Sequence, residues 1–470
     1  MRAPAADSIP SMTRARALFL LTMLPLAAQQ PREDPPHIVV LLADDLGWGD
    51  VGFHGSQIPT PNLDALAARG VRLEQFYAQP VCSPTRGALL TGRYPMRLGL
   101  QVGVVRPWAR HGLPLGERTL ANALGEAGYA TAICGKWHLG HATREQLPTS
   151  RGFDHQYGHY NGAIDYYSHM RDGGFDWHED DRVSHDEGYS TDLIAAAALR
   201  VLAAHDRQRP LFLYVPFNAP HTPLQAPAEW IEKFADIEDR QRRVYAAMVA
   251  CLDAAVGRIL AGLDEHGFAR NKTLVVFFSD NGGVLSLGSN GPLRGQKGQL
   301  YEGGIRVPAV VSWPGHLAEG RVVNDPLHVV DLYPTLLRVA GAKPEQAQPL
   351  DGRDAWTTLA VGDPMPEAVI LHNVTPWCGA LRRGRWKLVQ NGAVPANATQ
   401  GPARDTWELF DLDTDPGEQA DLAAEQPDVF ADLRARLEAL RAAAVAPVLT
   451  PNVAPEGFEV PKVWGEPRSR

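Results

Sequence analysis

Two pairs of side chains with oxygen donors, Asp44-Asp45 and Asp280-Asn281, each follow a run of apolar residues. Carboxylate and amide oxygens are hard ligands, which favour a divalent cation such as Ca²⁺, with Mg²⁺ as an alternative, and do not suit zinc. Each pair alone is explained as well by a helix cap or a turn. If the two runs are strands of one sheet, the four side chains together predict a metal site.

Basic side chains occur at the same kind of position, after apolar runs or just beyond them. Arg86, Lys136 and Lys297 could neutralise charge on the oxygens of an anionic group that the metal ion also holds. His221 could protonate a departing alcohol, and His138 could accept a proton from a nucleophile. Any one of them could instead be an ordinary loop residue, but their joint appearance does not fit chance well.

Cys82 begins the sequence Cys82-Ser83-Pro84-Thr85-Arg86, in which a proline and an arginine follow the cysteine at fixed spacing. A lone cysteine in a chain this long is more often a small buried hydrophobe than a nucleophile. An aldehyde made from it would hydrate to a geminal diol, whose two hydroxyls offer chemistry that no encoded side chain has. One hydroxyl can attack, and the other can then expel the product and regenerate the aldehyde.

Four continuous apolar runs are typical of strands buried on both faces of a parallel sheet. They cover residues 37–43, 131–134, 211–215 and 273–278. Helices are predicted over residues 62–69, 119–127, 190–204, 244–263 and 331–337. This order predicts a three-layer α/β domain, in which ligands bind at the carboxyl ends of the strands.

The last third of the chain changes character. Short strand-like pieces at residues 368–371, 380–383, 386–389 and 407–410 precede an amphipathic pattern over residues 427–444. They predict a small antiparallel sheet covered by one helix. We place the main domain at residues 36–340, this subdomain at residues 341–447, and a tail at residues 448–470 that packs on the domain or is extended. Trp377 and His372 either edge a substrate cleft or serve packing.

Charge and cysteine content exclude some classes of protein. The 470 residues carry a formal net charge of −9, so we expect no nucleic-acid partner, and an anionic substrate must meet positive charge locally. Of the four cysteines, Cys134, Cys251 and Cys378 remain if Cys82 is used in chemistry, which allows at most one intramolecular disulfide.

Residues 1–28 have the pattern of an export signal. Arg14 and Arg16 precede a short apolar run that closes on Ala27-Ala28. The run is too short to span a bilayer. We therefore expect a periplasmic or extracellular protein, with no membrane insertion after removal of the signal.

Several motifs carry a resemblance to a known family. Besides the Cys82 motif they are residues 43–48 (ADDLGW), 50–56 (DVGFHGS), 90–94 (LTGRY), 135–140 (GKWHLG), 165–169 (DYYSH), 280–283 (DNGG), 292–297 (PLRGQK), 302–304 (EGG) and 372–373 (HN). On these residues, nearly the whole mature chain resembles the type I, formylglycine-dependent sulfatases. Within that family it is most similar to the arylsulfatase B group, the N-acetylgalactosamine-4-sulfatases.

The resemblance implies an alkaline-phosphatase-like/sulfatase fold, with a large mixed sheet between helices and a small C-terminal antiparallel sheet with one helix. It implies that a formylglycine-generating maturation enzyme oxidises Cys82, and that the substrate is a sulfated carbohydrate, hydrolysed at 4-O-sulfate of N-acetylgalactosamine in glycosaminoglycans. The implied Ca²⁺ ligands are Asp44, Asp45, Asp280, Asn281 and residue 82. Arg86, Lys136, His138, His221 and Lys297 would complete the sulfate pocket.

The chain departs from this pattern at two places. Cys134 stands where the second family signature has a small non-cysteine residue, and residues 390–406 do not match the N-acetylgalactosamine-4-sulfatases. Four alternatives stay open: a sulfatase for another sulfated polysaccharide, a phosphodiesterase or phosphonate monoester hydrolase of the same superfamily, a silent glycan-binding protein, and a plain secreted structural domain, which leaves the joint presence of these residues unexplained. Two-zinc members of the superfamily generally have Asp-His where this chain has Asp280-Asn281, which favours a single-metal sulfatase.

Overall fold

The apolar run before Asp44 forms strand β1 (His37–Ala43) in the middle of a mixed sheet. The computed structural model describes residue 1 and residues 35–343, 346–393 and 405–465, so the predicted export signal lies outside the described residues. Across the sheet the order is β13 (Arg321–Val323), β2 (Val71–Leu73), β12 (Ala309–Ser312), β11 (Thr273–Ser279), β1, β10 (Leu211–Pro216), β4 (Ala130–Lys136), β5 (His155–His159), β8 (His178–Glu179) and β9 (Arg182–Val183). Strands β11, β1, β10, β4 and β5 are parallel, and β12 and β8 join this parallel centre in antiparallel pairs.

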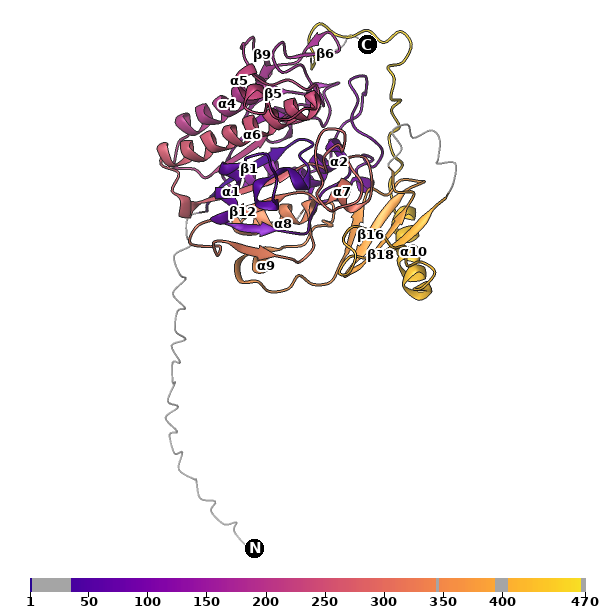
Figure 1. Ribbon diagram of the computed structural model, residues 1–470. Helices are drawn as coiled ribbons and strands as arrows, with labels where there is room; N and C mark the ends of the chain where they lie inside the picture. Colours follow the sequence, from indigo (N-terminus) through magenta and orange to yellow (C-terminus); the bar gives the residue numbers. More distant parts are fainter. Residues whose placement is uncertain (2–34, 344–345, 394–404, 466–470) are drawn as a thin grey trace. The chain divides into compact units, whose positions relative to one another are not determined.

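Helices cover both faces of this sheet, because successive side chains of a strand point to opposite faces. Ile38, Val40 and Leu42 of β1 pack in a core with α2 (Cys82–Thr91), α3 (Leu120–Glu126) and α8 (Val329–Val339). Val39 and Leu41 pack in a second core with α1 (Pro61–Ala68), α4 (Ser190–Ala204) and α6 (Arg240–Glu265). The three-layer arrangement is the predicted one (Figure 1).

Helix α6 is long and apolar enough to cross a membrane by length and composition alone. In this fold, however, 72% of its apolar window is buried, and its neighbours include α1, α4 and α5 (Ala228–Glu232). Burial of this kind is typical of the core helix of a globular domain.

The C-terminal part forms the expected small antiparallel sheet, in the order β15 (Val369–His372), β16 (Gly379–Arg383), β17 (Trp386–Gln390) and β18 (Trp407–Asp411). Helix α10 (Pro427–Ala442) packs on β16 and β17. Two short pairs lie outside the two sheets, β3 (Phe76–Tyr77) with β14 (Leu327–His328) and β6 (Met170–Arg171) with β7 (Gly174–Phe175). The remaining helices are α7 (Glu302–Ile305) and α9 (Trp356–Val361).

A buried cluster of charges joins the small sheet to the main domain. Lys387 of β17 lies 2.9 Å from Glu302 Oε1 of α7 and 2.7 Å from Glu418 Oε1, and all three side chains are fully buried. Glu418 Oε2 accepts a hydrogen bond of 2.6 Å from the backbone N–H of Glu302. The cluster thereby holds the end of the loop that carries Lys297.

His372 belongs to the same interior and does not edge a cleft. It is fully buried, with its ring 5.2 Å from that of Tyr77 and 5.5 Å from that of His328. Of the two expectations for this residue, packing is therefore the one observed.

The end of the subdomain and the tail lie against segments from the first half of the chain. The backbone N–H groups of Val445, before the tail, and Val448, its first residue, donate to the carbonyls of Met96 and Gly99. Further along, Trp464 is fully buried, and its N–H donates to the carbonyl of Phe175 in β7 at 2.9 Å. The tail thus packs beside the segment that follows α2 and beside the β6–β7 pair.

Candidate active site

The register of the central strands brings the two pairs of oxygen donors together. Ala43, the last residue of β1, pairs with Ser279, the last residue of β11, so Asp44 and Asp280 leave the sheet side by side. Asp45 adopts a left-handed backbone, with φ of +68°, which aspartate tolerates better than most residues. The chain therefore turns after Asp44, and both carboxylates face the same site instead of opposite faces.

The neighbouring strand β10 supplies His221. The backbone N–H of Asp44 donates to the carbonyl of Ala219 at 3.0 Å, and the Tyr166 hydroxyl lies 2.6 Å from the carbonyl of Asn218 and 2.7 Å from that of His221. These bonds hold the loop after β10 against the end of β1.

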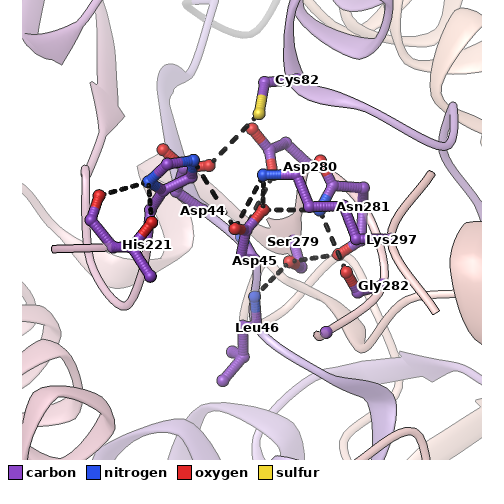
Figure 2. Close-up of polar contacts among 12 residues, drawn as sticks. Asp44, Asp45, Leu46, Cys82, His221, Ser279, Asp280, Asn281, Gly282 and Lys297 are labelled. Carbon is purple, nitrogen blue, oxygen red and sulfur yellow. Dashed lines mark hydrogen bonds and ion pairs between the residues drawn. The ribbon is translucent and has the colours of Figure 1, made fainter. Parts of the chain in front are cut away.

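The proton positions on His221 follow from its contacts. Nδ1 donates to the carbonyl of Thr222 at 2.5 Å, which leaves a lone pair on Nε2, 3.7 Å from Asp45 Oδ2 (Figure 2). Burial is the largest cause, and the charge of Lys297 the next, of a pKa of His221 lowered to about 3. The ring is therefore neutral at neutral pH until an anionic group approaches it.

The cysteine motif forms the first turn of α2, a helix that is buried along its whole length. Pro84 fits there because N–H groups of a first turn have no partner within the helix. The two other residues of the motif attach the turn to the strand ends. Ser83 Oγ donates to the carbonyl of His138 at 2.9 Å, and Thr85 Oγ1 donates to that of Asp280 at 2.6 Å.

Arg86 lies one turn after Cys82 on the same face of α2. Its guanidinium donates to Asp280 Oδ2 at 3.2 and 2.8 Å and to the carbonyl of Lys136 at 2.9 Å, and it is fully buried. The ammonium of Lys136 lies 2.5 Å from Asp44 Oδ2, and Cys82 Sγ lies 3.5 Å from Asp44 Oδ1. Two cations and the cysteine therefore share the same carboxylates.

Lys297 closes the set from the loop before α7. Its ammonium lies 2.6 Å from Asp45 Oδ1 and 2.7 Å from Asp45 Oδ2. The three cations Arg86, Lys136 and Lys297 then balance three carboxylates. A divalent cation added to this set would leave an excess of positive charge, which suits an oxyanion.

His138 follows β4 and lines the same pocket as Cys82. Its Nε2 donates to the carbonyl of Val105 at 3.0 Å, so Nδ1 carries the lone pair, and within the described chain Nδ1 is buried without a hydrogen-bond partner. A Cβ atom at Gly162 would lie 2.4 Å from the His138 ring, so glycine is required for this close approach. The pKa of His138 lies well below its usual value, mainly because the ring is buried and next because of the positive charges of Lys136 and Arg86. The ring is a neutral proton acceptor.

The oxygen set fits a hard divalent cation. Asp44, Asp45, Asp280 and Asn281 are at most 5% exposed, and the donor atoms of Asp44, Asp45, Cys82 and His221 lie within 4.8 Å of one another. Asn281 Oδ1 is buried and has no hydrogen-bond partner among the described residues, which is the state expected of an oxygen available to a metal ion. Burial is the largest cause, and the charge of Asp44 the next, of a pKa of Asp280 raised to about 6, although Arg86 lies 2.8 Å away. A bound cation would favour the ionised form of this carboxylate.

A pocket of about 310 Å³ opens over these groups. Its lining includes Cys82, His138, His221 and Lys297, together with two residues that the sequence analysis did not select, Arg106 and Arg171. Arg106 lies in the segment between α2 and α3, and Arg171 ends the short strand β6. Neither follows a strand of the main sheet, so the argument from strand ends could not find them.

Comparisons with known proteins agree with this geometry. The family model described as Sulfatase matches residues 36–342. Arylsulfatase J of Mus musculus is 38% identical over 457 residues, which cover 87% of this chain and 76% of that protein. N-acetylgalactosamine-6-sulfatase of Mus musculus is 37% identical over 377 residues, which cover 74% of this chain and 70% of that protein.

A solved structure gives the same result for the fold. The crystal structure of Ps i-CgsB in complex with k-i-k-neocarrahexaose superimposes with a TM-score of 0.81 at 33% identity, covering 88% of this chain and 95% of that chain. The expected alkaline-phosphatase-like/sulfatase fold is therefore confirmed. The chain belongs to the sulfatase family, and the reaction it catalyses is the hydrolysis of sulfuric esters.

Proposed function

We propose that this chain is an exported sulfatase that uses a formylglycine made from Cys82 and one Ca²⁺ to remove 4-O-sulfate from N-acetylgalactosamine in glycosaminoglycans. The observation that carries the proposal is the place of Cys82, at the start of α2 and 3.5 Å from Asp44 Oδ1. A site built for cysteine chemistry lowers the pKa of the thiol. Here the pKa of Cys82 is raised, mainly by burial and next by the negative charge of Asp280, which favours a converted residue over a thiolate.

In this proposal Asp44, Asp45, Asp280, Asn281 and residue 82 hold the Ca²⁺, which when bound would polarise a sulfate oxygen. The hydrated aldehyde at position 82 would supply the attacking hydroxyl. Magnesium suits the same oxygens, but calcium accepts a larger and less regular set of ligands, which fits five residues drawn from three separate segments.

The remaining residues bind the sulfate and move protons. Arg86, Lys136 and Lys297 neutralise charge on the sulfuryl oxygens, and Arg86 is oriented for this by Asp280 and the carbonyl of Lys136. His138 accepts a proton at Nδ1. His221 delivers a proton from Nε2 to the departing alcohol. The pKa of His221 is low in the free site, and the negative charge of a bound sulfate would raise it and so favour the protonated ring.

The sugar is inferred from likeness alone. The resemblance to the arylsulfatase B group favours 4-sulfated N-acetylgalactosamine at a non-reducing end, and one relative at 37% identity is an N-acetylgalactosamine-6-sulfatase. A second candidate, a sulfatase for another sulfated polysaccharide, is favoured by the likeness to a structure with bound k-i-k-neocarrahexaose. A phosphodiesterase or phosphonate monoester hydrolase is disfavoured, because Asn281 offers an amide oxygen where a two-zinc site needs histidine.

We also propose a location for the protein and a division of the chain into domains. The export pattern over residues 1–28 supports a periplasmic or extracellular protein, which a maturation enzyme modifies before or during export. We further propose a catalytic domain over residues 36–340, a subdomain over residues 341–447 and a tail over residues 448–470. The buried Lys387 cluster then lies where domain and subdomain meet.

Mass spectrometry of active protein tests the central step. The tryptic peptide from Leu73 to Arg86 should carry an aldehyde in place of the thiol. Cys82→Ser, made in a host that oxidises only cysteine, should abolish hydrolysis of 4-nitrophenyl sulfate and leave the thermal unfolding curve unchanged. An active protein that contains only the thiol would refute the formylglycine mechanism.

Two substrate panels test the rest. Aryl sulfates should be hydrolysed far faster than the matching aryl phosphates. A 4-sulfated N-acetylgalactosamine should lose its sulfate while the 6-sulfated isomer is left intact. Activity restricted to 6-sulfated sugars or to sulfated galactans would leave the enzyme class standing and overturn the sugar.

A further inference from the structure

The outer part of the pocket carries positive charge that the cleavage of one sulfate does not use. The charged residues of its lining are Arg106, Arg171 and Lys297, and no aspartate or glutamate of the described chain contributes to that lining. Lys297 is neutralised by Asp45 at 2.6 Å. Arg86 and Lys136, in contrast, pair with Asp44 and Asp280 and do not line this pocket.

Neither arginine has a strong ionic partner in the described part of the chain. Arg106 forms no ion pair with a described carboxylate, and its guanidinium donates instead to the neutral side-chain oxygen of Asn452. Arg171 pairs at 3.1 Å only with the adjacent Asp172, whose side chain is 45% exposed. An exposed pair of this kind contributes little and is easily exchanged for another anion.

The two guanidinium groups also act on each other. The pKa of Arg106 is lowered, mainly by burial and next by the positive charge of Arg171. Two like charges held in one partly buried pocket repel each other, and an anion bound between them removes that repulsion. Guanidinium groups suit this task, because their planar N–H donors match both sulfate and carboxylate oxygens.

The tail holds both arginines in place, so the arrangement is built and not accidental. Asn452 accepts from Arg106, and the carbonyl of Pro451 accepts from Trp108 Nε1 at 2.9 Å, two residues further along the same segment. On the other side, Trp464 Nε1 donates to the carbonyl of Arg171 at 2.9 Å. Two separate parts of the tail therefore contact these two lining residues, one at the guanidinium of Arg106 and the other at the backbone of Arg171.

We propose that Arg106 and Arg171 form a subsite for a second anionic group of the substrate, either a second sulfate or a sugar carboxylate, beside the sulfate ester that is cleaved. This inference rests on the proposed function and adds to it a preference for multiply charged glycans. Asn452 and Trp464 are positioning residues of the subsite. The sulfate that is cleaved and the second anionic group then bind to different cations.

Calorimetric binding to the Cys82→Ser variant tests the subsite without depending on turnover. The ligands are N-acetylgalactosamine 4-sulfate, its 4,6-disulfate, a chondroitin 4-sulfate disaccharide that adds a carboxylate, and galactan disaccharides with one or two sulfates. We expect the doubly charged ligand of at least one series to bind about tenfold more tightly than its singly charged partner, as one charge-assisted contact would give. The disulfate and the carboxylate ligands distinguish the two sources of the second charge.

Substitutions in the same background decide the assignment. Arg106→Gln and Arg171→Gln should each reduce that ratio to about twofold or less, by weakening only the doubly charged ligand. Arg110→Gln is the matched control, since Arg110 is exposed in the same segment and does not line the pocket. Asn452→Leu retains both arginines and should reduce the ratio in part.

Two results would overturn the inference: equal binding of singly and doubly charged ligands in both series, or a preference that survives both arginine substitutions. Failure of the proposed function is a separate observation, namely an unsubstituted protein with converted Cys82 that hydrolyses no sulfate ester.

Discussion

Replacing Lys387 with methionine should destabilise the protein strongly, because it removes the one cation that directly pairs with both Glu302 and Glu418. All three side chains are fully buried, at 2.9 and 2.7 Å separation. Removing one partner from a buried pair typically costs about 3–5 kcal/mol. Among the described residues, Glu302 would keep only Arg306 at 3.6 Å and the Tyr77 hydroxyl, and Glu418 only the N–H of Glu302. Methionine has nearly the volume of the lysine stem, so little of the loss would come from a cavity.

The pH dependence gives the prediction its sign. Burial raises the pKa of Glu418 from 4.5 to about 7 even with Lys387 present. A raised carboxyl pKa favours folding below the unfolded value, and this contribution is lost as the pH rises through about 7. Without Lys387 the pKa should rise further, so the loss in Lys387→Met should be smaller at pH 5 than at pH 8.

Urea unfolding followed by circular dichroism at both pH values measures these terms. Arg434→Met is the matched control, since Arg434 and Glu438 form an ion pair that is 46% and 50% exposed, and it should cost less than about 0.5 kcal/mol. The triple variant Lys387→Met, Glu302→Gln, Glu418→Gln should recover much of the stability. A loss under about 1 kcal/mol in Lys387→Met, or an equal loss at both pH values, would refute the reasoning.

Three further predictions concern the active site. His221→Ala should reduce kcat/KM more for sugar sulfates than for 4-nitrophenyl sulfate, because a good leaving group needs less protonation; equal losses would assign His221 to binding alone. Chelation should abolish activity, and Ca²⁺ should restore it better than Zn²⁺, since the proposed donors are oxygens; restoration by zinc alone would contradict the metal assignment. Gly162→Ala should lower kcat at least about tenfold with little change in Tm, because the added carbon would lie 2.4 Å from the His138 ring; unchanged kcat would show that the position of this ring is unimportant.

The parallel centre of the fold could be predicted because its strands are continuous apolar runs with polar ends. The prediction for residues 37–43 matches β1 residue for residue, and the polar residues that follow each run identify the sheet edge where the site forms. Strand β5 could not be found this way, since His155–His159 has no apolar pattern and is a strand through its pairing with β4.

Helix α2 could not be predicted from the sequence either, because it has no amphipathic pattern. All ten of its residues are buried, so it has no polar face and no helical period of apolar residues.

The candidate site could be predicted from local patterns only in part. The candidates at strand ends lie together, and every predicted site residue contributes to one connected group or to its pocket. Arg106 and Arg171 depend on contacts with a tail more than 280 residues away in sequence, which local patterns do not encode.

The residues proposed to cleave the ester and the residues that position Arg106 and Arg171 lie in different parts of the sequence. The strand ends, α2 and Lys297 all precede residue 300, whereas two arginines of the pocket lining, Arg106 and Arg171, are contacted by Asn452 and Trp464. Changes confined to residues 445–465 can therefore move Arg106 and Arg171 without replacing any of the residues proposed to cleave the ester.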